Sequence, residues 1–254
     1  MLILTVLFQI EDITVTGLDR YHPDDIITAS GIELGENLLR LNTGRIESEV
    51  LEAFTYLSSV QVSRRLPHSV EIAVRQYRPE FAAEHEDGLA LLTMQGKALE
   101  FGLTRSPGLP IVRGLALEDY QPGDMINGPD SPGNAERLVM LRYLFDAAAA
   151  TDFLPITNID VRDRLNMRVV HESRLVLELG SEADMEYKLT FLNHVIVNEI
   201  EPDAQARLDI SNARERRLVR RDGRVIDGEF ISGDLALQFA FQAPATQDTD
   251  YYDE

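Results

Sequence analysis

Residues 60–79, VQVSRRLPHSVEIAVRQYRP, constrain the fold of this chain more than any other stretch. On both sides of residues 66–69 (Leu-Pro-His-Ser), β-branched residues alternate with polar ones. A period of two is typical of a strand that buries one face, and proline favours a tight turn. Pro79 has no amide hydrogen, so it ends the second run or makes it an edge. The stretch predicts a β-hairpin.

A strand and two helices are predicted before this hairpin. Residues 8–16 alternate like a strand, and residues 21–32, YHPDDIITASGI, have the proline and acids of a helix start and a glycine at the end. A second helix is predicted from Asn42 or Thr43 to about Phe54, because its apolar residues recur at helical spacing. The predicted order is strand, helix, helix, strand, strand.

The rest of the chain predicts a β-rich unit with two helices, which makes the whole an α+β fold. Glycines and acidic turns separate short strands, and the glycine- and proline-rich residues 121–134 predict a loop. One helix is predicted from Asn134 to about Thr151, and a second one within 180–202, with Ser181 and Asp184 at capping-box spacing. The later strands are predicted near 156–161, 165–171, 174–179, 205–211 and 216–221.

Composition and motifs argue against most kinds of chemistry. The net charge is −19, from 24 basic and 43 acidic residues, and such a surface repels nucleic-acid phosphates. The chain has no cysteine, which excludes disulfides, cysteine-ligated zinc and thiol catalysis. Its five histidines do not stand at metal-site spacing, and the phosphate-loop, dinucleotide and nucleophile-elbow motifs do not occur. We expect no enzyme activity, no cofactor and no metal.

A run of arginines stands out from the acidic background. Residues 214–224, RERRLVRRDGR, place arginines on both faces of a predicted strand, so this strand is not expected to lie in a core. It is either an edge strand protected from aggregation by charge, a docking edge for a partner strand, or a patch attracted to anionic lipid.

The N-terminal residues 2–8, LILTVLF, are apolar but far shorter than the roughly 20 residues that span a bilayer. They lack the features of an intact signal peptide. They are either a first strand or loose terminus, or the outer end of a membrane helix.

Several blocks along the chain are informative through their order and spacing: residues 15–42, the hairpin 62–79, and the shorter blocks 91–101, 109–114, 177–192 and 208–211. The order of the first elements resembles a POTRA domain, and the blocks together resemble the bacterial cell-division protein family FtsQ, called DivIB in Gram-positive bacteria. Two positions depart from the pattern: Gln76-Tyr77 stand where the family often has an acidic residue before Arg-Pro, and Ser211 where it often has arginine.

The resemblance implies a bitopic membrane protein whose bulk lies outside the cell membrane, at the division septum. Its expected parts are the outer end of a truncated transmembrane helix at 1–8, a POTRA domain at 9–78, an FtsQ/DivIB β domain with two helices on its sheet at 79–222, and a largely disordered tail at 223–254.

The implied function is that of a non-catalytic divisome scaffold that binds FtsB/DivIC-like and FtsL-like partners. An alternative is a POTRA-type chaperone or transport module that binds clients by strand addition; a cell-wall hydrolase is disfavoured by the missing motifs. In the family, the last strands of the β domain bind partners. The expected partner-binding residues are Leu208 and Ile210, the docking strand residues Arg216, Leu218, Val219 and Arg220, and, more weakly, Lys188.

Overall fold

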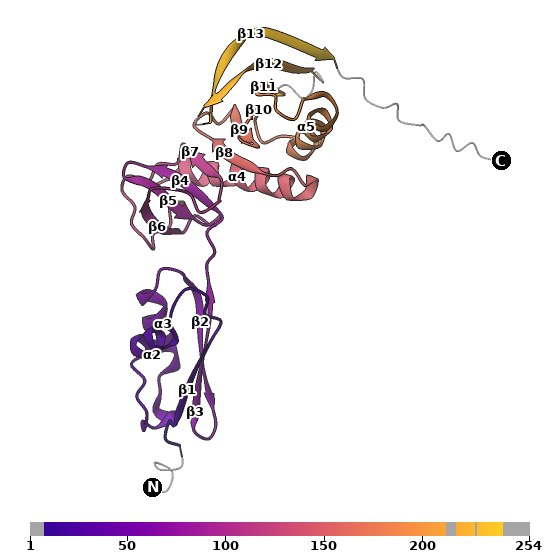
Figure 1. Cartoon of the computed structure of the whole chain (residues 1–254). Coiled ribbons are helices and arrows are strands. Elements are labelled where there is room, and N and C mark those ends of the chain that lie inside the picture. Colours follow the sequence, from indigo (N-terminus) through magenta and orange to yellow (C-terminus); the bar gives the residue numbers. More distant parts are fainter. Residues whose placement is uncertain (1–7, 212–216, 227, 241–254) are drawn as a thin grey trace, which may run out of the picture.

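The computed structural model describes residues 8–211, 217–226 and 228–240 and contains two separate β-sheets (Figure 1). In the N-terminal unit, two helices pack on a three-stranded sheet whose strand order is β1-β3-β2. The predicted order of strand, helix, helix, strand, strand is confirmed. The elements are β1 (Asp12–Thr16), α2 (Pro23–Ser30), the short 3-10 helix η1 (Leu38–Arg40), α3 (Thr43–Ala53), β2 (Leu57–Arg65) and β3 (Ser69–Gln76).

The helices of this unit end and begin where the sequence provides caps. Gly31 is left-handed at the end of α2, with φ of 62°, and its N–H donates to the Thr28 carbonyl at 3.2 Å. At the start of α3, the Asn42 side chain accepts a hydrogen bond from the Arg45 N–H at 3.2 Å. Between these caps, the apolar faces of the two helices pack against the sheet. The core contains Ile10, Ile26, Leu38, Ile46, Val50, Val62, Val70, Ile72 and Val74.

The hairpin prediction is confirmed. Strands β2 and β3 pair antiparallel, with Val62 opposite Ile72, and β1 lies parallel to β3 with Ile13 opposite Val70. Because the helices cover one face of this sheet, the alternate residues Val70, Ile72 and Val74 of β3 are buried. Pro79 follows the end of this strand, as its missing amide hydrogen requires.

The second unit is built on a ten-stranded sheet with the order β13-β12-β11-β10-β9-β8-β7-β4-β5-β6. Its elements are β4 (Phe81–His85), β5 (Gly88–Leu92), β6 (Ala98–Leu103), β7 (Ile111–Arg113), α4 (Pro132–Thr151), β8 (Ile156–Asp160), β9 (Met167–His171), β10 (Leu175–Gly180), α5 (Met185–Glu199), β11 (Ala206–Asp209), β12 (Arg217–Ile226) and β13 (Glu229–Ala240).

Helices α4 and α5 cover one face of this sheet and share a core with it (Figure 1). Helix α4 begins at Pro132, two residues before the predicted start. Asn134 is instead buried inside the first turn, and its side chain accepts from the Ala116 N–H at 2.9 Å and donates to the Ala116 carbonyl at 2.7 Å. The predicted capping box at Ser181 and Asp184 is wrong: α5 begins only at Met185, and Asp184 is itself the residue before the helix, left-handed with φ of 55° and without a side-chain capping hydrogen bond.

The two units touch around Tyr56, which shares an apolar cluster with Ala82 and Leu91 and also makes charged contacts. The Tyr56 hydroxyl donates to Glu100 Oε2 at 2.9 Å, and Arg20 reaches the same oxygen at 2.9 Å. The Arg20 guanidinium also lies 4.2 Å from the centre of the Tyr56 ring. Burial, helped by the neighbouring Glu100 carboxylate, raises the pKa of Tyr56 to about 12. Tyr56 is therefore a hydrogen-bond donor at all physiological pH values.

The predicted outer end of a membrane helix, residues 1–8, lies almost entirely outside the described residues. Among the residues that are described, no helix combines the length and the apolar character needed to cross a membrane.

His171 at the end of β9 gives the second unit a predictable pH dependence. The ring is 4% exposed, its centre lies 4.5 Å from that of the Phe153 ring, and burial lowers the pKa of His171. Glu172 opposes this effect and Arg174 adds to it. Histidine in the unfolded chain has a pKa of about 6.5. As the pH falls, the unfolded chain therefore binds a proton at this histidine more readily than the folded chain does.

We expect the free energy of unfolding to fall as the pH drops below about 6.5, by at most about 1.4 kcal/mol per pH unit from this group. Urea unfolding between pH 5 and pH 8 checks this, with His171→Phe as the comparison, because phenylalanine keeps the ring contact and removes the titration. An unchanged slope in the variant would assign the pH dependence to other groups.

Candidate partner-binding edge

The C-terminal strands form one edge of the large sheet. Strand β11 lies parallel to β10, β12 lies antiparallel to β11, and β13 lies antiparallel to β12. In the strand order β13 is outermost, and no strand from the described part of the chain pairs with its outer side (Figure 1). Strand β13 is twelve residues long, so this edge offers a long row of backbone groups.

This arrangement corrects the prediction that residues 216–220 form the exposed edge. Val219 in β12 stands opposite Asp209 on one side and Gln238 on the other, so the backbone of β12 is paired on both sides. The prediction of a largely disordered tail from residue 223 is also wrong as far as residue 240, because β12 continues to Ile226 and β13 follows. Arg216 and residues 241–254 lie outside the described residues.

The sequence contained a signal for β13 that the prediction missed. Asp227-Gly228 follows the apolar pair Val225-Ile226, and the apolar pair Phe230-Ile231 comes one residue after it, behind Glu229. An Asp-Gly pair between two such runs is a strong sign of a hairpin. Gly228 has φ of 78°, as such a turn requires. The arginine run indicated β12 as the edge strand. The residues after it form β13, which is the outermost strand of the sheet.

Three of the predicted partner-binding residues lie inside the protein. Leu208 and Ile210 belong to the core beneath α5, so their side chains cannot contact a partner at the surface. Lys188 is 2% exposed, and its Nζ donates to the Leu179 carbonyl at 2.7 Å and to the Ser181 carbonyl at 2.8 Å. Burial lowers the pKa of Lys188. These contacts tie the start of α5 to the end of β10.

Arg220 in β12 is also buried and makes contacts within the chain. Its Nε donates to Asp222 Oδ1 at 2.7 Å, and its terminal nitrogen donates to Glu201 Oε2 at 3.1 Å. Burial alone would lower the pKa of Arg220, but these two carboxylates raise it above its usual value. Arg220 therefore fastens β12 to the loop that follows α5. Leu218, the remaining predicted residue, stands opposite Phe239 of β13.

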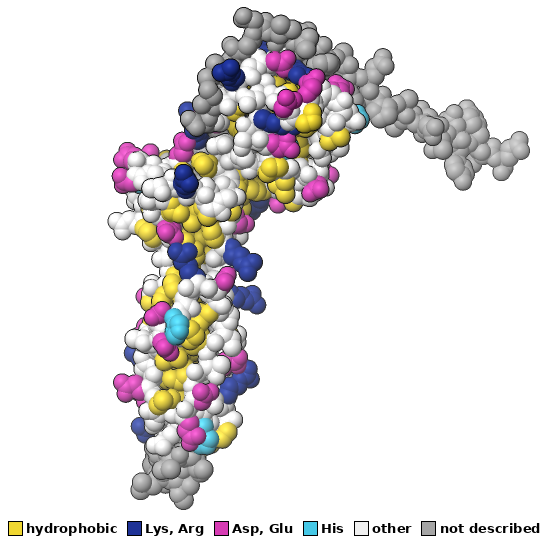
Figure 2. All heavy atoms as spheres, viewed as in Figure 1, with side chains coloured by type: hydrophobic (Ala, Val, Ile, Leu, Met, Phe, Trp, Pro, Cys, Tyr) yellow, Lys and Arg dark blue, Asp and Glu magenta, His cyan; other side chains and the backbone are white. Residues whose placement is uncertain are grey.

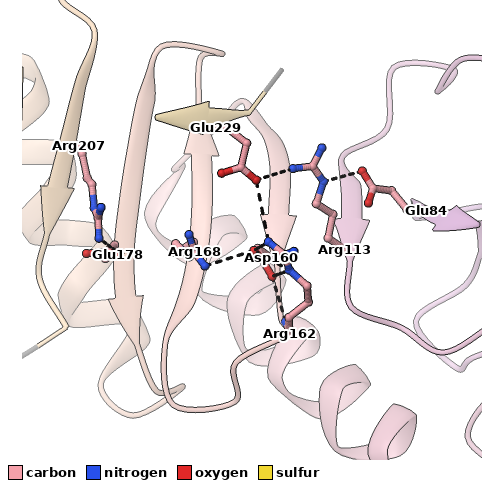
Figure 3. Close-up of polar contacts among 8 residues, drawn as sticks. All are labelled: Glu84, Arg113, Asp160, Arg162, Arg168, Glu178, Arg207 and Glu229. Carbon is pink, nitrogen blue, oxygen red and sulfur yellow. Dashed lines mark hydrogen bonds and ion pairs between the residues drawn. The ribbon is translucent and has the colours of Figure 1, made fainter. Parts of the chain in front are cut away.

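On the sheet face opposite the helices, charged side chains form a network (Figure 3). Arg113 in β7 donates to Glu84 Oε1 at 2.5 Å and to Glu229 Oε1 at 2.8 Å. Arg162 donates to Asp160 Oδ2 at 2.6 Å, and Arg168 lies 3.6 Å from the same oxygen. The network joins strands that are far apart in the sequence, from β4 to β13.

Arginine neighbours lower the pKa of one carboxylate on this face, Asp160. Burial alone would raise the pKa of Asp160, but the hydrogen bonds from Arg162 and the charge of Arg168 lower it. Glu178 is 5% exposed and pairs with Arg207. Within the described ranges, no three histidine, aspartate or glutamate side chains lie together in a way that could hold a metal ion.

The same network fixes the start of β13. Glu229 is its first residue, and its ion pair with Arg113 brings the hairpin turn against the sheet face (Figure 3). A side chain at Gly228 would meet the Asn158 side chain at 3.2 Å, so the turn rests directly on β8. A small cavity of about 60 Å³ lies beneath this turn, between Arg168 and Phe230. The chain thus fastens its own outer strand by specific contacts.

Comparison with known proteins supports both units. Residues 8–77 match the family described as "POTRA domain, FtsQ-type". This segment is the three-stranded unit with its two helices, and it ends where the first sheet ends.

Relatives that share more of the chain are cell-division proteins. The chain is similar to the cell division protein DivIB of Clostridium acetobutylicum, with 23% identity over 206 residues that cover 80% of each chain. It is also similar to FtsQ of Anaeromyxobacter sp. (strain K), with 26% identity over 75% of this chain and 63% of the relative. A shorter match, 29% identical, covers 38% of this chain and 43% of FtsQ of Corynebacterium glutamicum. The chain therefore contains an FtsQ-type POTRA domain at residues 8–77, and over most of its length it is similar to bacterial cell-division proteins named DivIB and FtsQ.

Proposed function

We propose that the chain is a non-catalytic scaffold of the divisome that holds FtsB/DivIC-like and FtsL-like proteins at the division septum. The FtsQ-type POTRA domain and the similarity to cell division proteins named DivIB and FtsQ support a role in cell division. The proposed mode of binding is addition of a partner strand to the large sheet, in which backbone hydrogen bonds give affinity and side-chain pockets give specificity. We also propose that an N-terminal membrane helix anchors the chain, with both units outside the membrane.

The observation that carries this proposal is the position of β13 at the end of the sheet. An outermost strand has unpaired N–H and C=O groups on one side, which is the geometry that a partner strand requires. The other edge strand, β6, has six residues, and its Glu100 contacts Arg20 and Tyr56 of the first unit. The edge at β13 is twice as long and points away from that contact (Figure 1).

Strand β12, the predicted docking strand, is already paired with β11 and β13 and so is not open to a partner strand. A partner can pair with β12 only after β13 has been displaced, and the ion pairs of Glu229 with Arg113 and the contact of Gly228 with Asn158 oppose this displacement. We therefore place the docking site on β13. In this proposal β12 supports the outer strand.

The chemistry of the open face fits a scaffold better than an enzyme. A general acid needs a carboxyl group whose pKa is raised toward neutrality, but the pKa of Asp160 is lowered by its arginine neighbours. Glu84, Glu178 and Glu229 likewise engage arginines. Release of peptidoglycan fragments by the purified protein would contradict this part of the proposal.

Site-specific photo-crosslinking in cells tests the proposed edge. A photoreactive residue at Asp234, in the middle of β13, is expected to capture the FtsB/DivIC-like partner. The matched control is the same residue at Leu103 in β6, the opposite edge of the same sheet, which is expected to capture none. Equal capture from both positions, or capture from Leu103 alone, would place the partner elsewhere.

A further inference from the structure

Three leucines are exposed at one end of the N-terminal unit. Leu34 is 67% exposed, Leu39 is 52% exposed, and Leu66 is 63% exposed. Single exposed leucines are common on soluble proteins, but a group of them at one place indicates a contact surface. The connection between α2 and α3 carries two of these residues, and the β2–β3 turn carries the third.

Backbone hydrogen bonds place these segments around the point where the chain enters the unit. The N–H of Gly35, next to Leu34, donates to the Ile10 carbonyl at 2.8 Å. The N–H of Leu38, next to Leu39, donates to the Phe8 carbonyl at 2.8 Å.

The β2–β3 turn reaches the same segment. The His68 carbonyl, two residues after Leu66, accepts from the Glu11 N–H at 2.8 Å, and the His68 ring nitrogen Nδ1 lies 3.3 Å from the Gln9 carbonyl. The segments that carry the three leucines therefore all bond to residues 8–11, close to the N-terminal end of the described chain (Figure 1).

Among the residues that the structure describes, the contact with the ten-stranded sheet lies at the opposite end of the POTRA unit, at Arg20 and Tyr56. In the space-filling view, hydrophobic side chains reach the surface at the lower end, next to charged ones (Figure 2). The sequence directly before Phe8 is apolar, LILTVL at residues 2–7. This apolar stretch joins the folded unit at Phe8, whose carbonyl accepts the hydrogen bond from Leu38, so the exposed leucines lie close to the point where it is attached.

The charges near the leucines are compatible with a membrane surface, although the whole chain carries −19. Arg64 donates to the Leu38 carbonyl at 3.0 Å and so lies beneath η1, and Arg65 pairs with Glu71. Arg40 is exposed next to Leu39. These three arginines stand against four nearby acids, Glu11, Glu33, Glu36 and Glu71, so this end carries only a small part of the excess negative charge and is repelled by anionic lipid less strongly than the surface as a whole.

We propose that this leucine end of the POTRA unit contacts the membrane surface, with Leu34, Leu39 and Leu66 inserted at the boundary between headgroups and acyl chains. The contact orients the protein, so that the POTRA unit stands on the bilayer and the ten-stranded sheet points away from it. This inference rests on the proposed membrane attachment and adds to it a defined face of the folded unit.

Tryptophan fluorescence gives a direct test because the chain has no tryptophan. Leu66→Trp and, separately, Leu39→Trp place one reporter in the proposed contact. Val197→Trp, at a position on α5 that is 75% exposed, is the matched control. Each full chain is tethered through an N-terminal His tag to vesicles of phosphatidylcholine and phosphatidylglycerol that contain a nickel-chelating lipid. The tether supplies attachment and the vesicles contain no partner protein, so the result is independent of the natural anchor and of partner binding at β13.

We expect the emission of Leu66→Trp and Leu39→Trp to shift to the blue on the vesicles and to be quenched by brominated acyl chains, while Val197→Trp shows neither change. Replacing Leu34 and Leu39 by aspartate in the Leu66→Trp chain should reduce the quenching by about tenfold, because charged side chains at this depth oppose insertion. Unshifted emission at both leucine positions, or an equal shift at Val197, would overturn the proposal.

Discussion

Replacing Gly17 by alanine is expected to lower the free energy of unfolding of the POTRA unit by about 3 kcal/mol or more. Gly17 follows β1 with φ of 84°, in the left-handed region that side chains other than glycine's rarely adopt. A Cβ atom at this position would lie 2.0 Å from the Val74 carbonyl oxygen, which is backbone in the central strand and cannot turn away. Either β1 separates from β3 or the unit loses its sheet register.

Gly31 provides a matched control within the same unit. It has φ of 62°, but a Cβ atom there meets nothing within 4 Å, so Gly31→Ala should cost only about 1 kcal/mol from backbone strain. Hydrogen exchange of the β1–β3 amides in the full chain measures both variants, and exchange of the ten-stranded sheet shows whether the effect stays local. Equal losses in the two variants would mean that φ, rather than the clash with Val74, sets the cost.

The parts of the fold that sequence patterns predicted are those that depend on local chemistry. The hairpin follows from period-two alternation around a proline turn, and α3 follows from Asn42 and the apolar spacing after it. The second unit was harder, because its strands pair across long sequence separations and its long sheet joins β4 to β7 and β10 to β11 in parallel. No local signal specifies these neighbours.

At the candidate site, too, the burial of single residues could not be predicted from local sequence. Lysine in a helix is normally expected at the surface, yet Lys188 is buried because the Leu179 and Ser181 carbonyls converge on its ammonium group. Arginines on both faces of a strand indicated an edge, yet Arg220 is buried between Glu201 and Asp222. In both cases, carbonyls or carboxylates contributed by other segments satisfy the charge, and their positions depend on tertiary packing.

Removing residues 229–254 is expected to weaken binding of the FtsB/DivIC-like partner by about a hundredfold or more. The deletion takes away β13, and with it the outer edge to which the partner strand is proposed to add. A loss of this size corresponds to about 3 kcal/mol, as expected when a main strand-pairing interaction is lost. Binding of the purified partner to the full chain and to the truncated chain, measured by calorimetry, gives the ratio.

A second truncation separates β13 from the residues that follow it. Removing only residues 241–254 leaves β13 in place and is expected to preserve the affinity within a few fold. Hydrogen exchange of β11 and β12 in both truncated chains verifies that the sheet next to the deletion still folds. Docking on β12 instead of β13 predicts the opposite result. If the partner pairs with β12, removal of residues 229–254 exposes that strand, and the truncated chain should bind more tightly than the full chain. Tighter binding would mean that β13 blocks the binding site until the partner displaces it, and that the partner binds the arginine-rich strand β12.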